Sequence, residues 1–205
     1  MRVRRLRHVW LLVGIVGVSS ILGSRAHALA GYLSMGYGRG GTHLRDLTGG
    51  QNYNTQAGSG LFLTGGALLT VSDTIPHRFE AQLGLGYMFQ DDAREELNST
   101  KWSRVPIEAL YYYRNTREMF RFGWGATYHV FNRISGKGAN LSVTRDVENA
   151  FGWVVAGEKL FNEPSKEGQA WGLGLKYVWL NYKSSSFVSD ADANTWYLTF
   201  SLLGK

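Results

Sequence analysis

The side chains best suited to chemistry in this 205-residue chain are charged residues that share one face of successive strand-like segments. They are Glu80, Glu108, Arg121, Glu158 and Lys176. Each belongs to a different segment, so acids and bases would face one another across a common interior. A charge in a narrow interior must find a partner of the opposite sign. The pattern predicts an internal ion network, which serves either as a structural plug or as a path for an ion or proton.

Large apolar side chains follow further along the same face. Six of them would surround one end of the interior: Phe62, Met88, Trp102, Phe131, Tyr182 and Tyr197. Such a ring either packs together and seals the interior, or lines a mouth that binds a small apolar molecule or an acyl chain. The residue types leave both alternatives open.

The chain contains serine and histidine residues that could act in nucleophilic catalysis, but no characteristic spacing in the sequence links them to one another. An acyl-transfer site needs a serine beside a histidine. The candidates are His43 with Asp46, the run Ser184–Ser186, and His129 on the inward face. With no cysteine in the chain, thiolate nucleophiles and thiolate metal sites are excluded. We expect no catalytic residue, no cofactor and no metal site.

The elements that must position these residues are eight segments in which apolar and polar residues alternate. They lie near residues 31–39, 59–71, 77–90, 102–114, 118–132, 149–161, 170–183 and 194–203. A period of two is typical of β-strands, because alternate side chains point to opposite faces. In the third segment, for example, Leu83 and Leu85 fall on one face and Glu80 and Gln82 on the other.

Four of these segments carry a Gly-apolar-Gly step, at residues 36–38, 84–86, 123–125 and 172–174. Each step places two glycines on one face and a large apolar residue on the other. The thin face leaves room for the curvature and the crossing side chains of a small closed barrel. An apolar outer face with a small or polar inner face is typical of a barrel that is surrounded by lipid. In a soluble lipocalin-like barrel, the apolar face would point inward.

The predicted connections alternate in length. Those at 72–76 and 115–117 are short, 162–169 is intermediate, and those near 40–57, 91–101, 133–148 and 184–193 are long. Transmembrane barrels have short periplasmic turns and longer external loops. We therefore predict an all-β fold, an eight-stranded antiparallel up-and-down transmembrane β-barrel, over residues 29–205.

The first 28 residues differ from the rest. Arg2, Arg4, Arg5 and Arg7 precede an apolar run from 9 to about 22, and residues 26–28 read Ala-His-Ala, a small-x-small cleavage site. This pattern predicts a signal peptide over 1–28. The leader holds five of the 22 Lys and Arg residues and no acid, so the remainder carries 17 bases against 16 acids. No excess of positive charge remains for nucleic-acid binding.

In pattern and topology, the chain from residue 29 onward resembles the small bacterial outer-membrane barrels of the OmpA, OmpX and OmpW-like superfamily. The segment Trp196–Leu202 resembles their C-terminal assembly signal, although Leu203, Gly204 and Lys205 follow it in place of a terminal aromatic residue. The resemblance implies a monomer in the outer membrane, exported through its leader and delivered to the barrel-assembly machinery. Its partners would then be outer-membrane lipid and lipopolysaccharide.

Three functions follow from these patterns. The first is a non-enzymatic envelope protein with a structural role, or with external bases such as Lys101 and Arg133 that contact lipopolysaccharide. The second is binding or passage of small hydrophobic molecules at the aromatic mouth, as OmpW-like barrels suggest. The third is a lipid A acyltransferase or deacylase, since such enzymes occur on this scaffold. A lumen filled with side chains above Glu108 would remove the second function and weaken the third.

Overall fold

The computed structural model describes residues 29–45, 52–95, 98–138, 141–162, 168–183 and 191–204, so the predicted signal peptide lies outside the described residues. These residues form twelve strands: β1 (Leu29–Gly40), β2 (His43–Arg45), β3 (Asn52–Gln56), β4 (Gly60–Thr74), β5 (His77–Glu95), β6 (Asn98–Asn115), β7 (Phe120–Gly138), β8 (Leu141–Val147), β9 (Ala150–Leu160), β10 (Gln169–Tyr182), β11 (Ala191–Asp192) and β12 (Thr195–Gly204). The described part holds no helix long and apolar enough to span a membrane.

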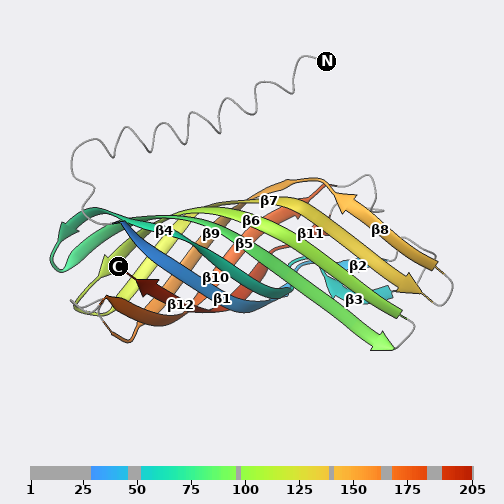
Figure 1. Ribbon diagram of the computed structural model, residues 1–205, viewed down its shortest axis with the longest axis horizontal. Coiled ribbons are helices and arrows are strands. Elements are labelled where there is room, and N and C mark those ends of the chain that lie inside the picture. Colours follow the sequence, from blue (N-terminus) through green and yellow to red (C-terminus); the bar gives the residue numbers. More distant parts are fainter. Residues whose placement is uncertain are drawn as a thin grey trace, which may run out of the picture.

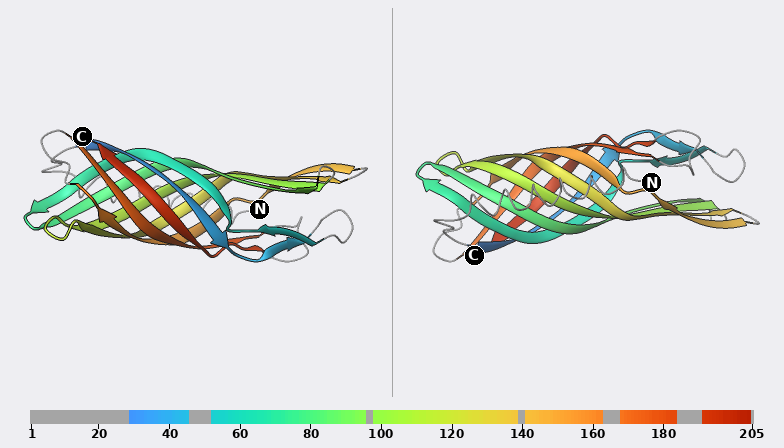
Figure 2. Two further views of the ribbon diagram at one scale, coloured as in Figure 1. Left: turned by 90° about the horizontal axis from the view of Figure 1, so that it is seen from below. Right: turned by 90° about the horizontal axis from the view of Figure 1, so that it is seen from above.

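Eight long strands form a closed antiparallel barrel. Going round the barrel, β1 is followed by β4, β5, β6, β7, β9, β10 and β12. The ring closes because β1 pairs with β4 on one side and with β12 on the other. Figures 1 and 2 show the resulting cylinder, with the short turns gathered at one end. The predicted eight-stranded up-and-down barrel is confirmed.

The long connections predicted near 91–101 and 133–148 are formed largely by continued, paired strands. Strands β5 and β6 stay paired as far as Glu95 and Asn98, and β7 and β8 pair as far as Gly138 and Leu141. A local cause contributes: Leu141–Val147 contains the β-branched residues Val143, Thr144 and Val147, which favour strand formation. These hairpins extend beyond the barrel, together with the smaller β2–β3 hairpin (Figure 2).

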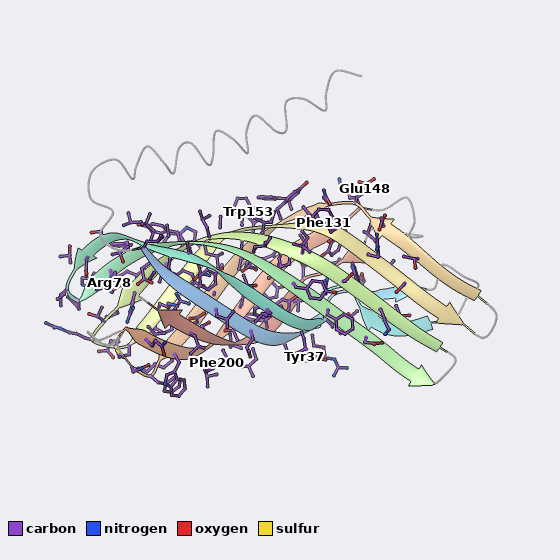
Figure 3. The ribbon with its side chains drawn as sticks, viewed as in Figure 1. Tyr37, Arg78, Phe131, Glu148, Trp153 and Phe200 are labelled. Atoms are coloured by element: carbon purple, nitrogen blue, oxygen red, sulfur yellow. The ribbon has the colours of Figure 1, made fainter. Side chains whose placement is uncertain are left out.

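Side chains alternate between the two faces as the period of two predicts. Leu85 on β5 and Leu198 on β12 point outward and are 60% and 63% exposed, whereas Glu80 on β5 is 1% exposed inside the barrel. Figure 3 shows the outward side chains projecting around the cylinder, with Tyr37, Trp153 and Phe200 among those labelled. The predicted apolar exterior and polar interior are therefore correct.

Two inward glycines show why the inner face is thin. A Cβ at Gly84 would collide with the hydroxyl of Tyr32, and one at Gly123 would collide with the ring of Tyr112. Tyr32 reaches Gly84 from β1, past the intervening β4, and Tyr112 lies directly opposite Gly123 on the adjacent β6. The glycines are therefore needed where large side chains from other strands fill a narrow interior.

A β-bulge on β7 overturns one predicted position. Ser103 on β6 pairs with Arg133, but Val105 pairs with Val130, so Phe131 and Asn132 together lie opposite a single residue of β6. Phe131 takes a left-handed backbone conformation, with φ of 51°. The extra residue shifts the alternation by one, and Phe131 points outward with 80% of its surface exposed. Its predicted place in the inward aromatic ring is wrong.

Candidate functional site

The lower lumen holds a charge cluster centred on Arg121 of β7. Its Nε donates to Glu158 Oε2 at 2.6 Å, and its Nη1 lies 3.9 Å from Glu80 Oε2. The other oxygen of Glu80 lies 3.5 Å from Nη1 of Arg114. The guanidinium of Arg121 also stands 4.2 Å from the centroid of the Tyr112 ring. The cluster joins β5, β6, β7 and β9 across the interior.

A second ion pair lies apart from this cluster. Lys176 Nζ of β10 donates to Glu108 Oε1 of β6 at 2.9 Å. The same ammonium lies 4.0 Å from the centroid of the Phe62 ring, and only 7% of the surface of Lys176 is exposed. The five charged residues predicted from the sequence thus meet in two groups, because Glu108 is the partner of Lys176 and Arg121 pairs with Glu158 and Glu80.

The ion network predicted from the sequence omits two members of the buried charge set. Arg114 pairs with Glu80 near the short turn, and Arg104 lies higher on the same inward face of β6. Both are at most 1% exposed. Both lie an even number of residues from Glu108 on β6, so the alternation of faces places them on the inner side with it.

The mouth of the barrel is covered by the chain segment Ala57–Ser59. Arg104 donates from Nη1 to the carbonyl of Ala57 at 2.6 Å and from Nη2 to the carbonyl of Ser59 at 2.7 Å. The hydroxyl of Tyr197 donates to the carbonyl of Gly58 at 2.6 Å. Arg104 therefore balances its buried charge with two backbone dipoles, and this ties the segment that precedes β4 to the barrel wall.

The remaining members of the predicted aromatic ring lie inside and pack together. Phe62 meets Tyr197 edge to face at 5.3 Å between ring centroids, and Trp102 meets Tyr182 at 5.0 Å. Met88 belongs to the same buried cluster. Below the Ala57–Ser59 segment, described side chains thus occupy the space above Glu108. This packing argues against a hollow passage through the mouth.

The catalytic candidates do not form a site within the described residues. His129 is 3% exposed, and its Nδ1 shares a hydrogen bond of 2.5 Å with the hydroxyl of Tyr182. Asp46 and residues 184–186 lie outside the described residues, and the side chain of His43 is not described. Among the described residues, no group of three His, Asp or Glu side chains is placed to hold a metal ion.

No family model matches the sequence, and no curated protein is similar to it in sequence. Some solved structures are similar. Neisserial surface protein A aligns at a TM-score of 0.48 and 10% identity, over 89% of this chain and 99% of the other. Ail, the attachment invasion locus protein of Yersinia pestis, in complex with the heparin analogue sucrose octasulfate, aligns at a TM-score of 0.48 and 10% identity, over 86% of this chain and 99% of the other.

The outer membrane protein OprG from Pseudomonas aeruginosa aligns at a TM-score of 0.40 and 13% identity, over 86% of this chain and 93% of the other. These likenesses are low in both identity and TM-score. The role of this chain therefore has to follow from its own side chains.

Proposed function

We propose that this chain is an integral, non-catalytic protein of the bacterial outer membrane, which presents β-hairpins to the cell surface and to lipopolysaccharide. One observation carries the proposal: the outer wall of the barrel is apolar on all sides, while its charges point inward. Leu33, Leu63 and Leu175 are each between 40% and 53% exposed on three different strands. A soluble monomer rarely exposes an apolar patch above a few hundred Å², whereas this band surrounds the whole molecule.

Aromatic side chains at both edges of the band support a membrane setting. Near the short turns, Phe161 stacks on Trp171 at 4.3 Å between centroids. Near the other edge, Tyr177 packs against both Trp179 and Trp196, at 4.5 and 4.6 Å. Aromatic girdles at the two interfaces are typical of transmembrane barrels, since these rings are stable at the boundary between acyl chains and headgroups.

The packed lumen supports a non-catalytic role. Its charges are paired with one another or with backbone carbonyls, and its upper part is filled by aromatic rings. An eight-stranded barrel has space for little more than its own side chains. The ion network thus acts as the structural plug, and the hairpins carry the contacts with other molecules.

The hairpins that extend past the barrel are the surface through which contact with lipopolysaccharide is proposed. They lie opposite the short turns, and so face outward from the cell in the usual orientation of such barrels (Figure 1). Lys101 of β6 pairs with Asp91 at 3.1 Å, and Arg133 of β7 pairs with Asp146 at 3.2 Å. Lipid A carries phosphates, for which such exposed bases are suitable partners.

Fractionation of cells that express the chain tests this function. We expect the protein in the outer-membrane fraction, and we expect the unboiled protein to migrate differently from the boiled protein on a detergent gel. Recovery as a soluble periplasmic protein without a heat-dependent shift would refute the proposed function.

A further inference from the structure

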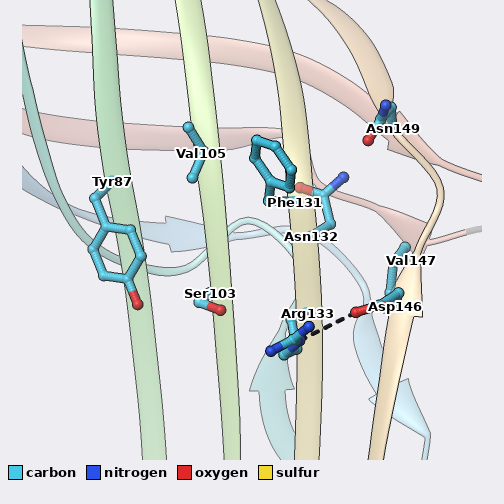
Figure 4. A pocket seen from close by; sticks show the side chains of 9 residues that line it. All are labelled: Tyr87, Ser103, Val105, Phe131, Asn132, Arg133, Asp146, Val147 and Asn149. Carbon is cyan, nitrogen blue, oxygen red and sulfur yellow. Dashed lines mark hydrogen bonds and ion pairs between the residues drawn. The ribbon is translucent and has the colours of Figure 1, made fainter.

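A cavity lies on the outer wall of the barrel beside the bulge of β7 (Figure 4). Its volume is about 510 Å³, which is within the range of about 300–1,000 Å³ typical of small-molecule sites. We call it the outer groove, and define it by Tyr87, Val105, Phe131, Asn132, Arg133 and Asp146. It lies outside the lumen, so the ion network and the aromatic seal take no part in it.

The bulge creates the outer groove. Two consecutive residues of β7, Val130 and Phe131, come to lie on the outer side, because the extra residue breaks the alternation. For an aromatic residue, the left-handed conformation of Phe131 is uncommon and costs free energy. Strain of this kind is found preferentially at functional sites. Here it places a ring that is 80% exposed beside the cavity.

The lining changes from apolar to polar along the strands. Tyr87, Val105 and Phe131 line the part nearer the middle of the barrel, and Arg133 and Asp146 lie on the side of the extended hairpin. On β7, the outward residues before the bulge are apolar as far as Val130, and the first outward charge after it is Arg133. The outer groove therefore crosses the upper edge of the apolar band, where acyl chains meet headgroups.

Two polar groups in the outer groove point to the ligand. Asn132 is 1% exposed, and its Nδ2 donates to the carbonyls of His129 and Glu148 at 3.3 and 2.9 Å. These bonds fix the amide orientation and leave the buried Oδ1 without a partner. Figure 4 shows this oxygen turned to the side of Phe131. An unmatched buried acceptor calls for a hydroxyl or amide donor.

Arg133 supplies the second group. Its Nε is held by Asp146 at 3.2 Å, and the structure gives its two Nη groups no partner among the described residues. The side chain is 64% exposed, so it can meet a ligand without first leaving a packed core. A guanidinium with free Nη groups is suited to a phosphate. Asp146 at the same place favours a ligand that also carries donor groups.

From this arrangement we propose that the outer groove binds one lipid A molecule of the outer leaflet. An acyl chain lies against Phe131, a phosphate reaches Arg133, and a hydroxyl or amide of the sugar backbone donates to Asn132 Oδ1. Phosphatidylcholine offers the phosphate and the chain but no hydroxyl or amide donor. The inference deepens the proposed function and rests on it, since the outer groove faces lipid only if the barrel spans the outer membrane.

The test is native mass spectrometry of the folded barrel, released from mild detergent and titrated with bisphosphorylated lipid A. We expect saturable binding of one molecule. Arg133→Gln should weaken it about tenfold, since a charge-assisted hydrogen bond is lost. The matched control is Arg78→Gln, which removes an equal charge from the surface ion pair with Asp73 at the opposite end of the barrel and should change binding less than twofold. Equal losses in the two variants would overturn the proposal.

Phe131→Gly tests the apolar part without endangering the fold, because glycine adopts the conformation of this position freely. It should weaken lipid A binding several-fold while the heat-dependent gel shift is retained. Phosphatidylcholine that binds as tightly as lipid A, or inorganic phosphate that displaces lipid A, would overturn the assigned ligand. A wild-type barrel that shows the gel shift but no saturable lipid A binding would refute the site and leave the proposed function standing. Loss of the shift in wild type would refute both.

Discussion

Arg121 is the side chain on which the lower lumen depends most. It is 1% exposed, and the cost of removing its charge from water is offset by Glu158, by Glu80 and by the ring of Tyr112. Glu158 also accepts a hydrogen bond from Ser201 at 3.1 Å, so the contact extends to β12. Loss of the guanidinium would leave two buried carboxylates short of a counter-charge.

We expect Arg121→Ala to lower the free energy of unfolding by about 3–5 kcal/mol, because breaking a buried ion pair leaves an uncompensated charge. Urea titration of the barrel in detergent measures this. Arg117→Ala, in the exposed turn between β6 and β7, is the control and should change the value by less than about 0.5 kcal/mol. Adding Glu158→Gln to Arg121→Ala should recover part of the loss. Equal urea midpoints for the two single variants would contradict a dry, paired lumen.

Gly84 is a second residue on which the packing of the lumen depends. A methyl group there collides with the Tyr32 hydroxyl. We expect Gly84→Ala to destabilise the barrel by about 1–3 kcal/mol, the usual range for overpacking. Adding Tyr32→Phe removes the colliding oxygen and should restore most of the stability.

The control for this prediction is Gly31→Ala. Gly31 faces outward on β1, with nothing within 4 Å of an added Cβ. The same substitution there should be neutral or stabilising by about 0.4–1 kcal/mol, because alanine loses less conformational entropy on folding. Thermal unfolding followed by the gel shift compares the two, and an equal change in stability at both sites would show that Gly84→Ala does not act through overpacking of the inner face.

At the scale of the strands, alternation predicted most of the architecture. Eight segments, their order and their inner and outer faces follow from a period of two, because lipid outside and a crowded lumen inside impose opposite demands on neighbouring residues. Alternation fails at Phe131, since a bulge is decided by the pairing with β6 and leaves no mark in the sequence of β7 alone. The partners of Arg121 also depend on strand pairing: Glu158 lies directly opposite it on β9, and Glu80 reaches it from β5, past the intervening β6.

The inner face has little tolerance for an added base. Gln82 is 5% exposed, and its Oε1 lies 3.5 Å from Nη1 of Arg121. An arginine at this position would bring a further base into a lumen where the described residues already bury four bases and three acids. An arginine is therefore unfavourable on the inner face as well as on the outer one. A test of the lipid-facing side compares arginine substitutions at two outward sites.

Strand β10 offers such a pair. Leu175 is 53% exposed in the middle of the apolar band, and Gln169 is exposed at the end of the same outward face. Leu175→Arg should cost about 2–4 kcal/mol in a lipid bilayer, and Gln169→Arg about 0–1 kcal/mol, because the penalty of a lipid-facing arginine falls with distance from the midplane. Folding into vesicles, followed by urea titration, measures both. Equal tolerance would show that β10 does not cross a bilayer in this orientation.

At the scale of the whole molecule, the barrel is closed from within by two different means. Paired charges occupy its lower part, and aromatic rings with the Ala57–Ser59 segment occupy its mouth. Trp102 is 0% exposed, packs on Tyr182, and lies 4.6 Å from the guanidinium of Arg104. It thus contacts both the aromatic seal and the residue that ties down the segment.

If these rings seal the lumen, Trp102→Ala should lower the stability of the barrel by about 3–5 kcal/mol, as expected for truncation of a fully buried tryptophan. Trp153→Ala removes an equal ring from the outer wall, where Trp153 is 61% exposed, and should cost much less. Urea titration in detergent measures both changes. The wild-type barrel should show no saturable quenching of tryptophan fluorescence by a small apolar probe, because packed aromatic rings and the Ala57–Ser59 segment occupy the mouth. Saturable quenching that Trp102→Ala abolishes without loss of stability would instead make the mouth a binding site, and the lumen would then be a functional interior.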